Sequence, residues 1–150
     1  MKKHILFTLF LFATISLWAQ EFNDYFINKT LRIDYIFTGN SIHQDICLDE
    51  LSALPTWAGR KHHLGELPLE GNGQIIVRDR YSKKVIYATS FSSLFQEWLE
   101  TDEAKTTNRG FENSFLVPYP IHPIEVEVTL FSSKREKRAT LTHVIDPSDI

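Results

Sequence analysis

Strict alternation of apolar and polar residues is the feature that most restricts the fold of this chain. The first clear run reads NKTLRIDYIFTGN, in which Ile33, Tyr35 and Phe37 alternate with polar neighbours. Successive side chains of a strand point to opposite faces, so this run predicts a strand with one buried and one solvated face. The Gly39-Asn40 pair that follows is typical of a strand end.

Several later segments have the same character. We expect strands in the segments HQDICLDEL (43–51), GQIIVRD (73–79), KVIYATSF (84–91), GFENSFLVPYPIHPIEVEVTLF (110–131) and ATLTHVI (139–145). The prolines at 118, 120 and 123 restrict the middle of the fourth segment to an edge or crossover position, because proline cannot donate to a sheet ladder. RYSK and SSKREKR are the expected turns.

One segment, SSLFQEWLETDEAK, changes to helical spacing. Ser93 followed by Gln96 is a capping-box pattern, which predicts the start of a helix. The apolar residues at helical spacing, which we expect to pack on a sheet, are Leu94, Phe95, Trp98 and Leu99.

About seven short strands and one amphipathic helix therefore follow from the patterns. Turn signals recur at the spacing of an antiparallel two-sheet β-sandwich, and we predict this fold, with an open β-barrel as the alternative. The 150 residues suit one domain with a core of its own.

The N-terminus predicts export. MKKHILFTLFLFATISLWAQ has two lysines, an apolar run and then Ala19, as in a secretory signal peptide. We expect residues 1–19 to be removed, leaving a domain at 20–150 that is secreted or periplasmic and has no integral membrane segment. The apolar run is shorter than the roughly 20 residues of a membrane span. An uncleaved anchor is the alternative.

Charge and cysteine content exclude some classes of protein. Sixteen Lys and Arg stand against nineteen Asp and Glu, a net charge of -3, whereas a nucleic-acid binder needs a basic surface. Cys47 is the single cysteine, so no intrachain disulfide can form. We expect Cys47 to be buried as a small apolar residue.

The stretch RKHHLGELPLEGNGQ is the candidate metal site, since it holds His62, His63 and Glu66. In a helix His62 and Glu66 would share a face, but the glycines and the proline argue against a helix here. In an extended chain His62 and Glu66 would again share a face, and the His63 side chain would point to the opposite face. Zinc needs three or four convergent ligands, so we favour a structural or surface role. His-Glu-x-x-His is absent from the sequence.

The same stretch belongs to a long connection, from Ala53 to Gly73, that is the candidate interaction surface. Trp57, His62 and His63 are its interface candidates, because loops on a rigid scaffold carry function and an exposed aromatic can anchor a partner. The sequence shows no nucleophile elbow and no phosphate-binding glycine loop, so we assign no catalytic and no cofactor-binding residue.

Four phrases of the sequence carry a family resemblance: FNDYFINKTLRIDYIFTGN, LDELSALPTWAGRKHHLGELPLEGNGQIIV, TSFSSLFQEWLETDEAK and GFENSFLVPYPIHPIEVEVTLF. With them the mature chain closely resembles the N-terminal domain of secreted bacterial metallopeptidases of the immunoglobulin A peptidase family. The resemblance implies a β-sandwich that precedes a zinc peptidase domain carrying the His-Glu-x-x-His helix. It implies no zinc ligand and no catalytic glutamate in this chain, and zinc only in the peptidase domain.

Three hypotheses follow. The first is a non-catalytic accessory domain that supports or positions the C-terminal metallopeptidase domain or its protein substrate. The second is a free-standing secreted module that binds protein or glycan, and the third is a metalloenzyme built on His62, His63 and Glu66. The abrupt end after DPSDI, directly behind a strand, leads us to expect further sequence.

Overall fold

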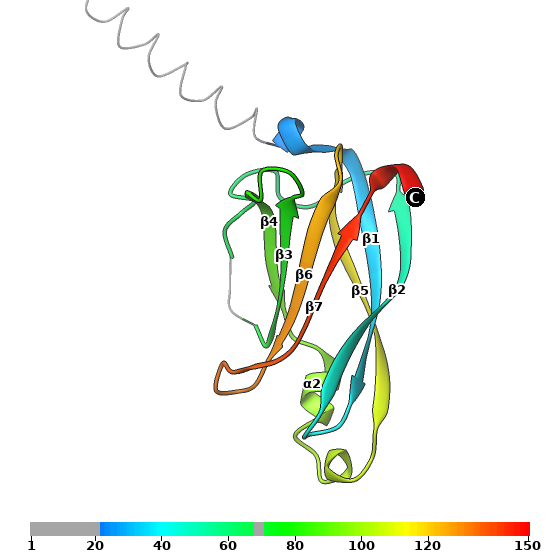
Figure 1. The fold of residues 1–150 in the computed structure, drawn as a ribbon, viewed down its shortest axis with the longest axis vertical. Coiled ribbons are helices and arrows are strands. Elements are labelled where there is room, and N and C mark those ends of the chain that lie inside the picture. Colours follow the sequence, from blue (N-terminus) through cyan, green and yellow to red (C-terminus); the bar gives the residue numbers. More distant parts are fainter. Residues whose placement is uncertain (1–21, 68–70) are drawn as a thin grey trace, which may run out of the picture.

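A computed structural model describes residues 22–67 and 71–150 (Figure 1). The strands are β1 (Phe26–Gly39), β2 (Gln44–Leu54), β3 (Gly73–Asp79), β4 (Val85–Phe91), β5 (Arg109–Pro120), β6 (Ile124–Phe131) and β7 (Lys137–Ile145). Helix α2 spans Leu94–Trp98, and short 3-10 helices η1 and η2 span Glu103–Lys105 and Pro147–Asp149. Residues 22–25 are helical and lead into β1.

The strands form two antiparallel sheets, which confirms the predicted β-sandwich. One sheet has the order β2-β1-β5 and the other the order β4-β3-β6-β7. Within the described ranges no strand is shared between the sheets, so the open barrel is not formed. Strand β5, which contains Pro118 and Pro120, is an edge strand, as the prolines predict.

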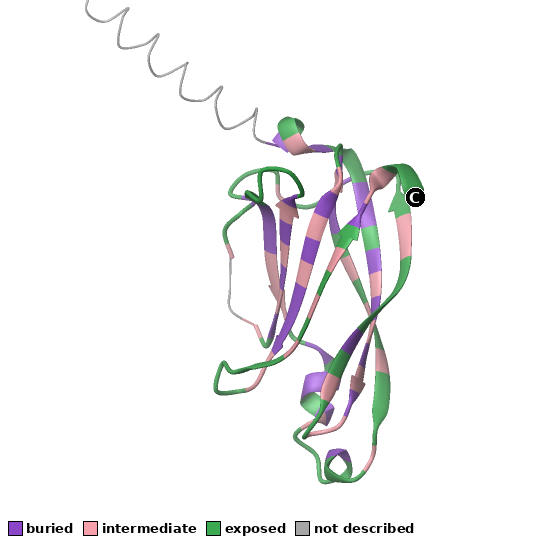
Figure 2. Cartoon of the chain, viewed as in Figure 1, coloured by how far each residue is buried: buried purple, intermediate pink, exposed green. Residues whose placement is uncertain are grey.

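The apolar residues of the alternating runs form the hydrophobic core between the two sheets. Ile33, Tyr35 and Phe37 of β1 are fully buried, and Val126 and Val128 face them from β6. Figure 2 shows this as buried bands that alternate along the strands. Strand β1 ends at Gly39, whose φ of 128° places it in a conformation that favours glycine.

Helix α2 is correctly placed but shorter than its pattern suggests. The Ser93 side chain accepts a hydrogen bond from the Gln96 backbone N–H, which confirms the predicted cap. Phe95 and Trp98 are buried, but Leu94 is 70% exposed, so its predicted core position is wrong. The helix is only five residues long, and its first residue, Leu94, lies on the solvent side.

Cys47 is exposed, so the prediction of burial is also wrong. Its neighbour Ile46 faces the core opposite Phe37, and Cys47 lies opposite Ile36, whose neighbours Tyr35 and Phe37 point inward. Cys47 therefore lies on the outer face of a sheet, which no second layer covers among the residues that the structure describes.

The two ends of the sandwich are built from different segments and are here called the helix end and the terminal end. The helix end holds the β1–β2 turn, α2 and the β6–β7 turn; the terminal end holds residues 22–25, the β3–β4 and β5–β6 turns, and Ile150 (Figure 1). The Tyr119 hydroxyl donates to the carbonyl of Pro147 at 3.0 Å, which fixes η2 against β5 at the terminal end.

Candidate functional site

The long connection starts two residues later than expected, because β2 continues through Leu54. Its described part, residues 55–67, is here called the β4 loop, since it runs beside strand β4. The Ala88 backbone N–H donates to the carbonyl of Leu64 at 2.8 Å, and the Leu64 side chain is buried. The loop thus covers part of an edge that would otherwise expose unpaired backbone groups.

Arg60 holds the β4 loop in shape. Its guanidinium donates to the carbonyls of His63 (2.7 Å), Leu64 (3.1 Å) and Glu66 (2.8 Å), and to that of Ala88 in β4. The same group lies 5.3 Å from the centre of the Tyr87 ring, within cation–π range. One side chain therefore satisfies carbonyls of both the loop and the strand.

Trp57 packs inside the domain. Its side chain is 7% exposed, and its ring meets Tyr87 edge-on with centroids 5.9 Å apart. The indole N–H donates to the Arg60 carbonyl at 2.9 Å. A Cβ at Gly59 would lie 2.2 Å from the Trp57 ring, so glycine allows this close approach. Trp57 can thus shape the loop, while little of its ring remains for a partner.

His62, His63 and Glu66 are all exposed on the β4 loop. His63 Nδ1 lies 3.1 Å from Glu66 Oε1, and His63 has a positive φ of 52°. Across residues 22–67 and 71–150, no three His, Cys, Asp or Glu side chains come together as metal ligands would. A zinc ion needs more ligands than the His63–Glu66 pair supplies, so these residues do not fit one.

The other histidines of the described chain lie far apart in the fold. His43 Nε2 is 2.8 Å from Asp45 near the β1–β2 turn, and His122 is exposed in the β5–β6 turn at the opposite end. His143 lies in β7 with its ring directed between the sheets, where its Nε2 is 2.7 Å from the Tyr35 hydroxyl.

The Tyr35–His143 pair is a polar link inside the core. Burial lowers the pKa of the His143 imidazole and raises the pKa of the Tyr35 hydroxyl above its ordinary value. His143 Nδ1 is buried and has no hydrogen-bond partner within the described structure. The neutral imidazole is therefore the form that the folded domain favours.

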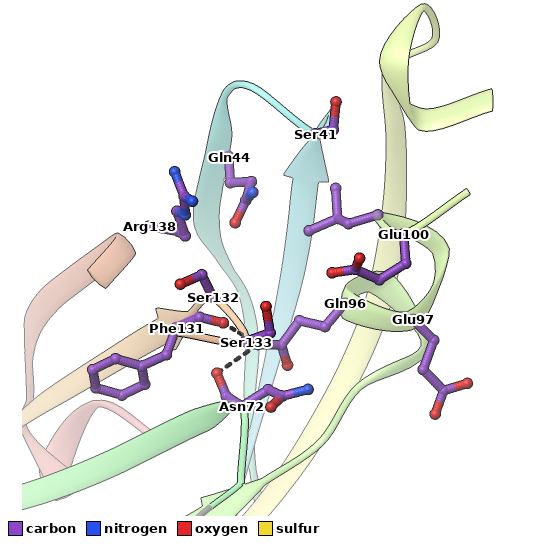
Figure 3. Close-up of a pocket in the computed structure, with 11 residues that line it drawn as sticks. Ser41, Gln44, Asn72, Gln96, Glu97, Glu100, Phe131, Ser132, Ser133 and Arg138 are labelled. Atoms are coloured by element: carbon purple, nitrogen blue, oxygen red, sulfur yellow. Dashed lines mark hydrogen bonds between the residues drawn. The ribbon is translucent and has the colours of Figure 1, made fainter. Parts of the chain in front are cut away.

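An open pocket of about 430 Å³ lies at the helix end (Figure 3). It is lined by the β1–β2 turn, Asn72, the α2 region (residues 93–101) and the β6–β7 turn, so four distant segments build it. Gln96 forms part of its floor: the side-chain N–H₂ donates to the carbonyls of Asn72 and Phe131. The Ser93–Gln96 pattern predicted the cap, but no local signal predicted this tie to the sheet.

The terminal end carries most of the large apolar side chains that are exposed in the described structure. Strand registers and turns place these at that end: Ile27, Leu54, Tyr81, Val85, Ile121, Val144 and Ile150. Tyr81, in the β3–β4 turn, is 75% exposed. Lys61 of the β4 loop also reaches this end, since its ammonium is 3.1 Å from Asn28 Oδ1. Exposed apolar groups gathered in one region are typical of an interaction surface.

The fold and these surfaces define a β-sandwich module with an ordered edge loop and one apolar end. A family model described as the N-terminus of peptidase M64 matches residues 21–142, and the chain belongs to this family, the immunoglobulin A peptidases. A search of curated proteins gave no match. Within residues 22–67 and 71–150, no helix has the length and apolarity needed to cross a bilayer.

Proposed function

We propose that this chain is the non-catalytic accessory N-terminal domain of a secreted zinc metallopeptidase. It would support or position a C-terminal peptidase domain, or that domain's protein substrate. Family membership supports this role, because the matched model describes the N-terminal part of a peptidase family. Zinc and the catalytic residues would belong to the peptidase domain, and the residues described above hold no matching ligand set.

The apolar terminal end is the observation that carries the proposal. Tyr81 and Ile121 project from two neighbouring turns there, and η2 is tied down beside them through Tyr119. A domain that follows Ile150 would start from this end and could bury these side chains. Burial of aromatic and aliphatic anchors is the main source of binding energy in most interfaces.

The β4 loop is a second part of the proposed interface. Lys61 and His62 are exposed where the loop meets the terminal end, and Arg60 holds the loop in one conformation. A preformed loop loses little entropy on binding, which favours a stable contact. In this role Trp57 acts by packing the loop, whereas His62 and His63 would touch the partner.

Export through a signal peptide at residues 1–19 is part of the proposal. This segment lies outside the described residues, so its support is the sequence pattern alone. Mass spectrometry of the exported protein tests it: we expect a mature N-terminus at Gln20. An intact N-terminal Met1 on the exported protein would contradict cleavage.

The interface is tested in the intact gene product. We expect Tyr81→Ser and Ile121→Ser to destabilise docking by about 1–2 kcal/mol each, measured as reduced hydrogen-exchange protection of the terminal end. The matched controls are Ile42→Ser and Leu94→Ser, since both side chains are at least 70% exposed but lie at the helix end. The controls should leave that protection unchanged.

Two results would overturn the proposal. One is a gene that stops directly after the codon for Ile150, because no peptidase domain would then follow. The other is equal hydrogen exchange at the terminal end in the intact protein and in the separate 20–150 fragment.

A further inference from the structure

The pocket at the helix end has no role in the proposed docking, because it lies at the opposite end of the sandwich from Tyr81 and Ile121 (Figure 1). Its volume of about 430 Å³ falls within the range of small-molecule sites, roughly 300–1,000 Å³. A pocket of this size that keeps unused polar groups is a candidate binding site in its own right.

The walls of the pocket are held in place by the fold. Gln96 joins α2 to the ends of β3 and β6 through the carbonyls of Asn72 and Phe131. The Ser41 backbone N–H donates to the carbonyl of Ala104 at 2.9 Å, which fixes the β1–β2 turn against η1. The Ser132 hydroxyl accepts from backbone groups within the β6–β7 turn. The segments that carry the lining side chains are therefore already fixed relative to one another.

Two of the side chains that line the pocket are turned toward one space. Figure 3 shows the Glu100 carboxylate and the Gln44 amide directed into the pocket from facing walls, while Glu97 turns away. In the described structure neither Gln44 nor Glu100 has a side-chain hydrogen bond or ion pair with another residue. A carboxylate only accepts hydrogen bonds, whereas an amide both donates and accepts.

The charges around the pocket are of opposite sign on its two sides. Glu97 and Glu100 lie on the α2 side, and Arg138 lies on the β7 side, where it pairs with Glu136 at 3.2 Å. A ligand with a net charge is attracted by one side and repelled by the other, so neither sign of charge gains from both walls. A neutral ligand can form hydrogen bonds to both sides without either repulsion.

Hydroxyl groups match this set of partners, since each can donate to Glu100 and accept from an amide N–H or from Arg138. The neutral Gln44, Asn72 and Ser133 side chains add further donors and acceptors around the same space. We propose that the pocket binds a neutral, hydroxyl-rich ligand: a sugar unit of a glycan. Leu99, half-buried in the lining, would supply the apolar contact for one face of the sugar ring.

The test uses the intact protein and defined sugars as probes. Hydrogen exchange is measured with and without N-acetyllactosamine, a mannose trisaccharide or a maltose oligomer at millimolar concentrations. We expect at least one sugar to give saturable protection of residues 41–47 and 93–101, with no change around Tyr81. This protection does not depend on peptidase activity or on docking of a peptidase domain. A negative result would therefore count against sugar binding and not against the proposed function.

Two variants with the same change in charge give the control. Glu100→Ala should weaken sugar binding about tenfold or more, because a hydrogen bond to a charged group is lost. Glu112→Ala removes another exposed carboxylate from β5, outside the pocket, and should leave the affinity unchanged. Gln44→Ala should also weaken binding.

Three results would overturn the proposal. The first is no saturable protection by any of the sugars, and the second is equal loss of affinity in Glu100→Ala and Glu112→Ala. The third is protection of the pocket by a lysine tripeptide but by none of the sugars, which would assign the pocket to a peptide instead.

Discussion

In both the β4 loop and the α2 region, a polar side chain donates to backbone carbonyls and helps to hold the segment to the four-stranded sheet, and the β4 loop has the Ala88–Leu64 backbone hydrogen bond in addition. In the β4 loop this is the guanidinium of Arg60, which reaches four carbonyls, three of them within the loop itself. In the α2 region it is the amide of Gln96, which reaches two carbonyls outside its own segment.

The two segments differ in how far their own secondary structure and buried apolar side chains stabilise them. The α2 region has a capped helix and buries Phe95 and Trp98, so Gln96 only fixes its position. The β4 loop has no regular structure, and Arg60 stands in for the missing backbone ladder. A segment without regular hydrogen bonds must find other donors for its buried carbonyls.

The sharpest test of the comparison is Arg60→Ala. We expect this change to lower the free energy of unfolding by about 2–4 kcal/mol, since the part-buried hydrogen bonds to the Leu64 and Ala88 carbonyls lose their charged donor. Arg60→Lys should recover only part of the loss, because an ammonium cannot present the flat fork of a guanidinium. Chemical denaturation measures both variants. If Arg60→Ala lowered the free energy of unfolding by less than Gln96→Met does, the β4 loop would depend less on its polar side chain than the α2 region.

Gln96→Met is the corresponding change in the α2 region, with a side chain of similar length. We expect a smaller loss of stability, about 1–2 kcal/mol. The Asn72 carbonyl keeps a second donor, the Phe131 backbone N–H at 2.7 Å, so it is not left without a partner. Hydrogen exchange should rise in residues 93–101 and stay constant in the β4 loop. Increased exchange in both segments would show that the two are not independent.

The sequence predicted those features that depend on local pattern. The alternation of apolar and polar residues predicted the strands, and the capping-box pattern of Ser93 and Gln96 predicted the start of the helix. The same alternation places Cys47 on the face opposite Ile46, so its exposure follows once the outer face is known to lack a covering layer. Leu94 was misplaced because it is the first residue of a helix of only five residues and lies on the solvent side, which the spacing alone does not show.

The candidate sites depend on contacts between distant segments, which local pattern does not contain. Arg60 meets Ala88, and Gln96 meets Phe131, only after the sheet has formed. The glycines and the proline around His62 and His63 correctly indicated a loop, but not that Arg60 would order it. The pocket joins four segments, so no single stretch of sequence carries a signal for it.

The smallest predicted effect concerns His143 of β7, which links the two sheets through the Tyr35 hydroxyl of β1. Burial lowers its folded-state pKa below the ordinary value of 6.5, so the unfolded chain takes up a proton first as the pH falls. The contribution of His143 to stability is therefore complete above pH 6.5 and is lost as the pH falls from 6.5 through the lower folded-state pKa. Unfolding free energies measured across this range should decrease toward acid.

The matched variant for this effect is His143→Gln, which keeps a hydrogen-bonding partner for the Tyr35 hydroxyl but does not titrate near neutral pH. We expect a flatter stability profile between neutral and mildly acidic pH than in the unmodified protein. The buried Tyr35 hydroxyl does not contribute, because its raised pKa keeps it protonated throughout this range. An identical slope in both proteins would show that His143 is not the source of the pH dependence.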